Sequence, residues 1–321
     1  MLAIHAVRTG GPEVLEAVDL PVPSPGPGQI LVRHQAVGLN FIDTYHRGGL
    51  YPMKMPAVLG LEAAGIVEAL GEGVARFAVG DRVAYNGTLG AYAEAAVVPA
   101  DRAVKVPDEV SLETAAAVLL KGMTAEFLVR RCHRVEPGQT VLVHAAAGGV
   151  GSILVQWAKA LGATVIATVG SEAKAALARD HGADHVILYG QEDVAARAAE
   201  ITGGQGVAVV YDGVGKDTFE ASLKSLGRRG VLATFGNASG PAPPIAPLEL
   251  AGKSLFLTRP RLYDYIATTA ELDDSAAALF AVLAYGAVKI DVGQTFPLAE
   301  ARAAHEALEG RRTTGATLLI P

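Results

Sequence analysis

The feature of this sequence that most constrains its fold is a glycine-rich turn in the segment TVLVHAAAGGVGSILVQWAKALGA, residues 140–163. The apolar run that precedes the glycines is typical of a buried strand. The residues that follow them place one apolar face on a helix: Val150, Ile153, Leu154, Trp157, Ala158 and Leu161. A strand that enters a helix through such a turn is typical of a parallel α/β sheet that binds a dinucleotide.

The glycines of this turn have separate expected roles. Gly148 and Gly149 would let the backbone approach a pyrophosphate, and Gly151 would let the helix lie close to the strand. The helix start supplies unpaired N–H groups and the positive end of the helix dipole. Ala146 replaces the first glycine of the usual G-x-G-x-x-G pattern, so a tight turn without a ligand is the alternative interpretation.

The strand before this turn is the first of six expected strands. The others are short apolar runs with helical patterns between most of them: Thr164–Val169, His185–Tyr189, Val207–Tyr211, Gly230–Phe235 and Ser254–Thr258. This order predicts a doubly wound parallel sheet. The chain before Leu120 instead shows short alternating segments broken by proline and glycine, which predicts a β-rich domain.

Length and charge restrict the function classes. A chain of 321 residues predicts two domains. Its 27 basic and 33 acidic residues give a net charge of −6 without runs of like charge, so neither nucleic acid nor a membrane surface is an expected partner. No apolar stretch is long enough for a membrane span, and the N-terminus lacks a signal pattern, so we expect a cytoplasmic protein. Cys132, the only cysteine, excludes an internal disulfide.

The second strand ends in TVGSEAKAA, where an NAD-specific sheet would place an acidic residue. Gly170 and Ser171 leave room there for a 2′-phosphate, and Lys174 offers it a positive charge. This pattern favours NADPH. The alternative for Lys174 is a solvated surface lysine, and Glu172 is expected to face water on the first helical turn.

Several further segments carry a family resemblance. They are GLNFIDTYHRGGLYP, MPAVLGLEAAG, LKGMTA, HAAAGGVG, VYDGVG, FGNASG, TRPRL and RRTTGATLLIP. With these segments in this order, the chain resembles the zinc-independent quinone oxidoreductases, the zeta-crystallin-like branch of the medium-chain dehydrogenase/reductase superfamily, nearly end to end. The resemblance implies an α/β architecture with a GroES-like catalytic domain (1–122), a six-stranded Rossmann NADPH-binding domain (123–260) and a C-terminal return to the catalytic domain (261–321). It also implies a cofactor in the cleft between the domains.

The resemblance also implies cofactor contacts. It places Gly148, Gly149, Val150 and Gly151 at the pyrophosphate, and it places Ser171, Lys174, Tyr189 and Arg311 around the 2′-phosphate, where the strand pattern already makes Gly170 a cofactor-binding candidate. Thr124, Phe235, Asn237 and Arg259 would line the rest of the channel, although Phe235 could be a core residue and Asn237 and Arg259 could be turn and surface residues. Asp43 is a further cofactor-binding candidate, with an Asx-turn as the alternative.

The zinc-dependent relatives of this family carry a cysteine and a G-H-E segment, and this chain has Asn40 and Leu61 in their places. We therefore expect no metal, and direct hydride transfer to an electron-poor acceptor. The amide of Asn40 and the hydroxyls of Tyr45 and Tyr51 would stabilise the negative charge that grows on a quinone oxygen. The alternative is that the tyrosines fill a loop and Asn40 caps a turn.

Three functions stay open at this point. The first is NADPH-dependent reduction of quinones, and the second is reduction of activated C=C bonds in enals, enones or enoyl thioesters. The third, a nucleotide-binding structural or RNA-associated protein, is disfavoured by the net charge of −6. We also expect a homodimer through the Rossmann domains, because the apolar last strand Ser254–Thr258 would otherwise leave an exposed sheet edge.

Overall fold

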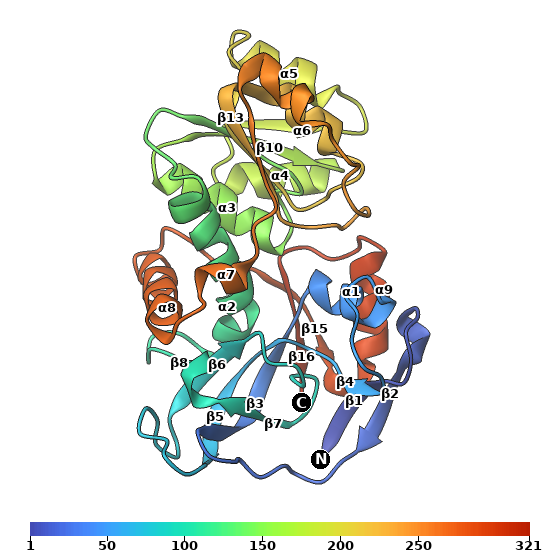
Figure 1. The fold of residues 1–321 in the computed structure, drawn as a ribbon, viewed down its shortest axis with the longest axis vertical. Helices are drawn as coiled ribbons and strands as arrows, with labels where there is room; N and C mark the ends of the chain where they lie inside the picture. The colour runs from blue at the N-terminus through green and yellow to red at the C-terminus, as the bar shows by residue number, and fades with distance from the viewer. The chain divides into compact units, whose positions relative to one another are not determined.

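The computed structural model describes residues 1–321 as two compact units. The first unit comprises Met1–Met123, Ile266–Ala284 and Ile290–Pro321, and the second comprises Thr124–Tyr265 and Tyr285–Lys289. The chain thus builds most of the first unit, then the second, and returns to complete the first (Figure 1).

Two β-sheets form the first unit. A three-stranded sheet has the order β2–β1–β4, and a seven-stranded sheet has the order β15–β16–β3–β5–β6–β8 with β7 also paired to β3. The strands are β1 (Leu2–Ala6), β2 (Leu15–Asp19), β3 (Gln29–Leu39), β4 (Ala57–Val58), β5 (Glu62–Leu70), β6 (Arg82–Asn86), β7 (Ala95–Pro99), β8 (Ala103–Lys105), β15 (Val292–Pro297) and β16 (Ala316–Ile320). Strand β16 runs antiparallel to β3 with Thr317 opposite Leu39, so the end of the chain braces the strand that leads into Asn40.

The helices of the first unit follow or cover these sheets. They are α1 (Phe41–Gly48), α2 (Leu112–Phe127), which continues into the second unit, α8 (Thr269–Ala284) and α9 (Ala301–Glu309), with short 3₁₀ turns η1 (Pro12–Val14), η2 (Ala100–Arg102) and η5 (Leu298–Glu300). Helices α1 and α9 lie side by side (Figure 1), joined by Arg47 of α1, which donates to His305 Nδ1 and Glu309 Oε1 of α9.

A parallel sheet with the strand order β11–β10–β9–β12–β13–β14 forms the core of the second unit. Its strands are β9 (Thr140–Val143), β10 (Thr164–Val169), β11 (His185–Leu188), β12 (Val207–Asp212), β13 (Leu226–Thr234) and β14 (Phe256–Thr258). The other elements are α3 (Gly149–Ala160), α4 (Glu172–Asp180), α5 (Val194–Ile201), α6 (Phe219–Ser225), α7 (Leu262–Tyr265), the π-helical turn η3 (Leu128–Cys132) and the 3₁₀ helix η4 (Pro247–Lys253). The predicted six-stranded doubly wound sheet is confirmed.

One strand begins earlier than its apolar pattern predicts. Strand β13 starts at Leu226 and not at Gly230, because Leu226 already pairs with Val207 before the register of the two strands shifts. Arg229 lies within this irregular part with a left-handed φ of 58°. Two exposed arginines at 228 and 229 interrupt the apolar pattern, so a hydropathy-based prediction misses the first residues of the strand.

Each unit has its own apolar core. In the first, side chains of β1, β3 and β5 pack with those of α9, including Ile4, Val32, Val67 and Ala304. In the second, Leu142, Ile166 and Val210 pack with residues of α5 and α6. None of the helices combines the length and the apolar composition that a bilayer crossing would need.

Candidate active site

The start of helix α1 carries the residues expected to contact the electron acceptor. Asn40 has an extended backbone and is the N-cap of α1, a position that asparagine favours. Its backbone N–H donates to Asp43 Oδ2 at 2.9 Å, and the N–H of Asp43 donates to the backbone carbonyl of Asn40 at 3.0 Å. These two bonds fix the angle at which the chain leaves β3 and enters α1.

Tyr45 and Tyr51 lie against each other at the other end of this helix. Their ring centroids are 5.4 Å apart with an edge-to-face angle of 75°, and the N–H of Tyr51 donates to the carbonyl of Tyr45 at 3.1 Å. Phe41 and His46 extend the aromatic cluster at centroid distances of 6.4 Å and 5.8 Å. The structure therefore brings the two expected tyrosines together, as it must if both contact one small ligand.

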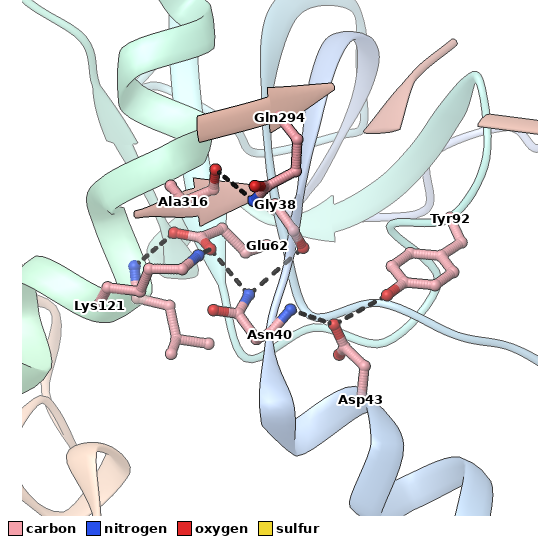
Figure 2. Close-up of polar contacts among 9 residues, drawn as sticks. Gly38, Asn40, Asp43, Glu62, Tyr92, Lys121, Gln294 and Ala316 are labelled. Atoms are coloured by element: carbon pink, nitrogen blue, oxygen red, sulfur yellow. Dashed lines mark hydrogen bonds and ion pairs between the residues drawn. The ribbon is translucent and has the colours of Figure 1, made fainter. Parts of the chain in front are cut away.

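The side chain of Asn40 is already engaged within the protein. Its amide Nδ2 donates to Glu62 Oε2 at 2.8 Å and to the carbonyl of Gly38 at 3.3 Å (Figure 2). Both amide hydrogens are thus used, and the amide oxygen is turned away from the carboxylate of Glu62. This differs from the role of hydrogen-bond donor to a quinone oxygen that the sequence suggests.

Asp43 is fully buried and has internal partners. Besides the N–H of Asn40, its Oδ2 accepts the hydroxyl of Tyr92 at 3.0 Å (Figure 2). Burial raises the pKa of Asp43 to about 7, against the hydrogen bonds from Asn40 and Tyr92 and the charge of Lys121, which lower it. Asp43 therefore supports the start of α1, which agrees with its interpretation as a turn residue.

A chain of buried hydrogen bonds continues from Asp43 to helix α9. The Tyr92 oxygen lies 3.0 Å from His305 Nε2, and Arg47 Nη1 lies 2.8 Å from His305 Nδ1. Because a guanidinium can only donate, Nδ1 must accept, Nε2 must carry the proton, and Tyr92 must donate to Asp43. Burial, followed by the charge of Arg47, lowers the pKa of His305 to about 3, in keeping with a neutral ring.

The glycine-rich turn of the second unit has the close packing that its sequence predicts. Gly148 is the extended N-cap of α3. A Cβ added at Gly151 would lie 2.2 Å from the carbonyl oxygen of Ala145, which itself has a left-handed φ of 51°. Only glycine at 151 lets the helix approach the turn this closely, and the first N–H groups of α3 stay open to an anion.

The residues expected around a 2′-phosphate gather where β10 and β11 end. A Cβ added at Gly170 would lie 2.4 Å from the hydroxyl of Tyr189, whose N–H donates to the carbonyl of Val169. Ser171 is the N-cap of α4, where its Oγ accepts the N–H of Lys174 at 3.4 Å. The serine hydroxyl thus keeps its own hydrogen for a ligand. Arg311, the remaining candidate, belongs to the first unit.

The other channel candidates of the second unit lie at the ends of β13 and β14. Arg259 Nη1 donates to the carbonyl of Thr234 at 2.7 Å, and the Asn237 amide, oriented to satisfy both its ends, accepts Arg259 Nη2 at 3.0 Å. The Phe235 ring covers Gly213, where an added Cβ would lie 3.0 Å from it. The sheet thus groups Phe235, Asn237 and Arg259, whereas Thr124 is a buried residue of α2.

Two models of known families match the chain: the alcohol dehydrogenase GroES-like domain over residues 26–108 and the zinc-binding dehydrogenase over residues 149–281. A quinone oxidoreductase of Pseudomonas aeruginosa is 51% identical over 321 residues and covers 99% of both chains. A 2-haloacrylate reductase of Burkholderia sp. is 47% identical over 323 residues, covering 98% of this chain and 97% of that protein. The crystal structure of Escherichia coli quinone oxidoreductase complexed with NADPH has a TM-score of 0.98 at 48% identity and covers 100% of both chains.

This chain belongs to the zinc-independent quinone oxidoreductase family.

Membership in this quinone oxidoreductase family accounts for the architecture of both units. The GroES-like model falls within the β-rich first unit, and most of the second model falls on the parallel sheet of the second. The predicted combination of a GroES-like domain and a Rossmann domain is therefore confirmed. The name of the second model mentions zinc, but no three His, Cys, Asp or Glu side chains gather in this chain in a way that could hold a metal ion.

The sequence interpretation missed two groups of polar residues in this quinone oxidoreductase. One is the set of buried partners behind Asn40 and Asp43: Arg47, Glu62, Tyr92, Lys121 and His305. The only local signal for Glu62 is its place directly after Leu61, the residue that replaces a zinc ligand of the relatives. Lys121 lies in the segment LKGMTA, which contributes to the family resemblance but gives no indication of what the lysine does.

The second missed group supports the glycine-rich turn. His144, buried at the end of β9, lies 2.8 Å from Thr168 Oγ1 and 3.0 Å from Ser222 Oγ. Asp212 at the end of β12 accepts the hydroxyl of Ser222 and the N–H groups of the two residues Val214 and Gly215. This network ties together the ends of β9, β10 and β12, where the expected cofactor residues lie.

Proposed function

We propose that this enzyme reduces quinones with NADPH by direct, metal-free hydride transfer. The chain is an NADPH-dependent oxidoreductase of the quinone oxidoreductase family, and NADPH is its cofactor. The quinone as acceptor is the part that we add. The observation that carries it is the pair of tyrosines at the end of α1, Tyr45 and Tyr51, in edge-to-face contact on the helix that Asn40 begins.

These residues have a chemical role in such a reaction. When bound, NADPH supplies the hydride. A quinone that accepts it gains negative charge on an oxygen, which tyrosine hydroxyls stabilise by donating hydrogen bonds. The rings of Tyr45 and Tyr51 also give a flat acceptor an aromatic surface to pack against.

The second unit has features that fit the cofactor. The close approach at Gly151 and the open N–H groups of α3 suit a pyrophosphate near Gly148, Gly149 and Val150. For the 2′-phosphate we propose Ser171 and Lys174, with Gly170 and Tyr189 as further candidates. Thr124, Phe235, Asn237 and Arg259 are the proposed lining of the remaining channel, and Asp43 is proposed to act through α1.

Reduction of an activated C=C bond is the second candidate. The 47% identity to a 2-haloacrylate reductase favours it, because a haloacrylate presents such a bond next to a carboxylate. The same residues could orient an enal, enone or enoyl thioester. A cytoplasmic location stays a prediction from the sequence.

A panel of acceptors decides between these candidates. NADPH oxidation is followed at 340 nm with 1,4-benzoquinone, 1,4-naphthoquinone, 2-chloroacrylate, an enal and an enoyl thioester at equal concentrations. We expect the highest kcat/KM with a quinone. A higher kcat/KM with any of the C=C substrates would replace the proposed function by the second candidate.

Removal of the tyrosine hydroxyls should slow the quinone reaction. Tyr45→Phe and Tyr51→Phe keep the ring contact and lose only a hydrogen-bond donor, so we expect kcat to fall by about tenfold in at least one variant, the effect of about 1.4 kcal/mol. The dissociation constant for NADPH, from quenching of protein fluorescence, should stay the same. Parent values of kcat in both variants would show that the acceptor binds elsewhere. Tyr285→Phe, at an exposed tyrosine, is the matched control.

A further inference from the structure

Glu62 is a fully buried carboxylate in β5 to which the proposed reaction assigns no role. Its Oε1 accepts the N–H of Leu120 at 2.6 Å, and its Oε2 accepts Asn40 Nδ2 at 2.8 Å and Lys121 Nζ at 3.2 Å (Figure 2). A carboxylate without water is costly unless it is paired and hydrogen-bonded, and here both oxygens have partners. Its position is therefore fixed by three elements: β5, α2 and the start of α1.

The neighbouring strand leaves space for this carboxylate. Gly38 of β3 is paired with Glu62 in the sheet register. A Cβ added at Gly38 would lie 2.3 Å from Glu62 Oε2 and 2.3 Å from the carbonyl oxygen of Ala116 in α2. A side chain at residue 38 would displace the carboxylate or the helix, so glycine at this position permits the contact between Glu62 and Asn40.

The contact determines which end of the Asn40 amide faces outward. An ionised carboxylate only accepts hydrogen bonds, so it must face the NH₂ group of the amide. The carbonyl of Gly38 takes the second hydrogen of the same group. The N–H of Asp43 goes to the backbone carbonyl of Asn40 and not to its side chain, so the amide oxygen is the polar group that Asn40 can offer to a ligand.

We propose that Glu62, neutralised by Lys121, is a positioning residue that presents the amide oxygen of Asn40 as a hydrogen-bond acceptor for an N–H or O–H donor of the ligand. This inference rests on the proposed function, which places a ligand beside Asn40. Two sources can provide the donor: the carboxamide or a ribose hydroxyl of NADPH, or a hydroxyl group on the acceptor. In either case the tyrosine hydroxyls, and not Asn40, face the oxygen of the quinone that becomes negative.

Reversing the polarity of the pair tests this role. Glu62→Gln can turn an NH₂ group toward Asn40 and thereby release its orientation, and Asn40→Asp places two carboxyl groups in contact. We expect each variant to weaken the binding of the ligand that carries the donor group about threefold to tenfold, as for one lost hydrogen bond. The double variant Asn40→Asp/Glu62→Gln restores a donor facing an acceptor and keeps an oxygen outward, so it should return to within about threefold of the parent.

The pH profile distinguishes positioning from a structural role. In Asn40→Asp alone, a shared proton restores the internal hydrogen bond, so the loss should shrink as the pH is lowered from 8 to 6. The double variant should show no such recovery. Glu68→Gln, at an exposed glutamate of the same strand, should behave as the parent. A double variant no better than the worse single variant, or parent behaviour of Glu62→Gln in all measurements, would overturn the proposal.

Separate measurements identify the donor and keep the proposal independent of the acceptor. The dissociation constant for NADPH is measured without any acceptor, and KM is compared for 1,4-naphthoquinone and 2-hydroxy-1,4-naphthoquinone. A weaker NADPH complex of Glu62→Gln places the donor on the cofactor, and a higher KM for the hydroxyquinone alone places it on the acceptor. If the parent enzyme reduces no quinone, the proposed function fails, and an unchanged NADPH complex of Glu62→Gln then overturns this inference as well.

Discussion

Two buried carboxylates close to the start of α1 are stabilised in different ways. Glu62 is in direct contact with the ammonium group of Lys121. Asp43 has no cation in contact, and Tyr92 and His305 separate it from Arg47. Because its second oxygen, Oδ1, is buried without a partner, the charged form of Asp43 is only partly compensated. This difference explains why burial dominates the pKa of Asp43.

The raised pKa of Asp43 predicts a pH-dependent stability. Its pKa of about 7 in the folded chain exceeds the ordinary value of 3.8, so the folded state holds a proton that the unfolded state releases. The stability that this group contributes is fully present below about pH 4 and is lost as the pH rises through about 7, at up to about 1.4 kcal/mol per pH unit. Asp43→Asn should therefore remove this contribution, so the free energy of unfolding of the parent should fall relative to that of the variant as the pH rises from 5 to 7.

Urea unfolding at several pH values checks this expectation. The groups that face Asp43 are Tyr92, Lys121 and Glu62, with His305 and Arg47 behind Tyr92. Among them, His305 has its pKa lowered to about 3, so it stays neutral in the folded chain but gains a proton on unfolding below its ordinary value of 6.5. This contribution is common to the parent and the variant, so the difference between their profiles reports Asp43. Asp180→Asn, at an exposed aspartate of α4, should keep the parent profile. An equal slope in the parent and in Asp43→Asn would contradict the prediction.

We expect the choice of cofactor to depend on Lys174. A charge-assisted contact contributes about 1.5–3 kcal/mol, so Lys174→Ala should weaken the binding of NADPH about tenfold to a hundredfold and leave NADH nearly unchanged. Titrations of both cofactors against the parent and the variant measure this. Equal losses for the two cofactors would assign Lys174 to the fold or to the adenine, and a parent that prefers NADH would remove the 2′-phosphate site. Lys159→Ala, at a lysine of α3 paired with Asp184, is a control for charge.

At the scale of elements, local sequence was enough to predict the glycine-rich strand–turn–helix unit but not the network behind Asn40. Gly148 to Gly151 act within one strand–turn–helix unit, where the spacing of glycines has a direct physical meaning. The bonds of Glu62, in contrast, reach Asn40 and Lys121 at sequence separations of 22 and 59 residues, and Tyr92 meets His305 at a separation of 213. Such contacts form only when β3, β5, α2 and α9 pack together, so the hydrophobic periodicity of the sequence cannot predict them.

Replacing the glycine at the start of α3 should separate this helix from its strand. In Gly151→Ala the new Cβ would meet backbone atoms of Ala145 and Ala146, which cannot move aside without distorting the turn. We expect a loss of about 1–3 kcal/mol in the free energy of unfolding, and weaker NADPH binding as well. Gly190→Ala is the control, because an added Cβ there meets nothing within 4 Å. If Gly151→Ala has the same free energy of unfolding as the parent in urea, then α3 does not lie as close to the backbone of Ala145 as described.

At the scale of the whole molecule, the first unit is built from segments at both ends of the chain, and the second unit lies between them in sequence. Residues before 124 and after 289 share the seven-stranded sheet, where β16 pairs with β3 beside Asn40, the residue that begins α1. Helix α9, from the same returning segment, supplies His305 and Glu309 to Arg47 of α1. The C-terminal segment therefore supports the helix that carries Tyr45, although it is distant in sequence.

The second unit leaves one sheet edge that favours association of two copies. Strand β14 pairs only with β13; its first residue, Phe256, is 60% exposed, and Leu248 of η4, which packs along β13, is 83% exposed. An apolar edge strand of this kind is stabilised when a second copy covers it, most simply about a two-fold axis. We therefore expect a homodimer in light scattering at micromolar concentration. The double variant Leu248→Glu/Phe256→Lys should be monomeric, whereas Val79→Lys, at an exposed valine of the first unit, should remain a dimer. A parent protein that is monomeric under these conditions, or a double variant that stays dimeric, would show that β14 is not the contact.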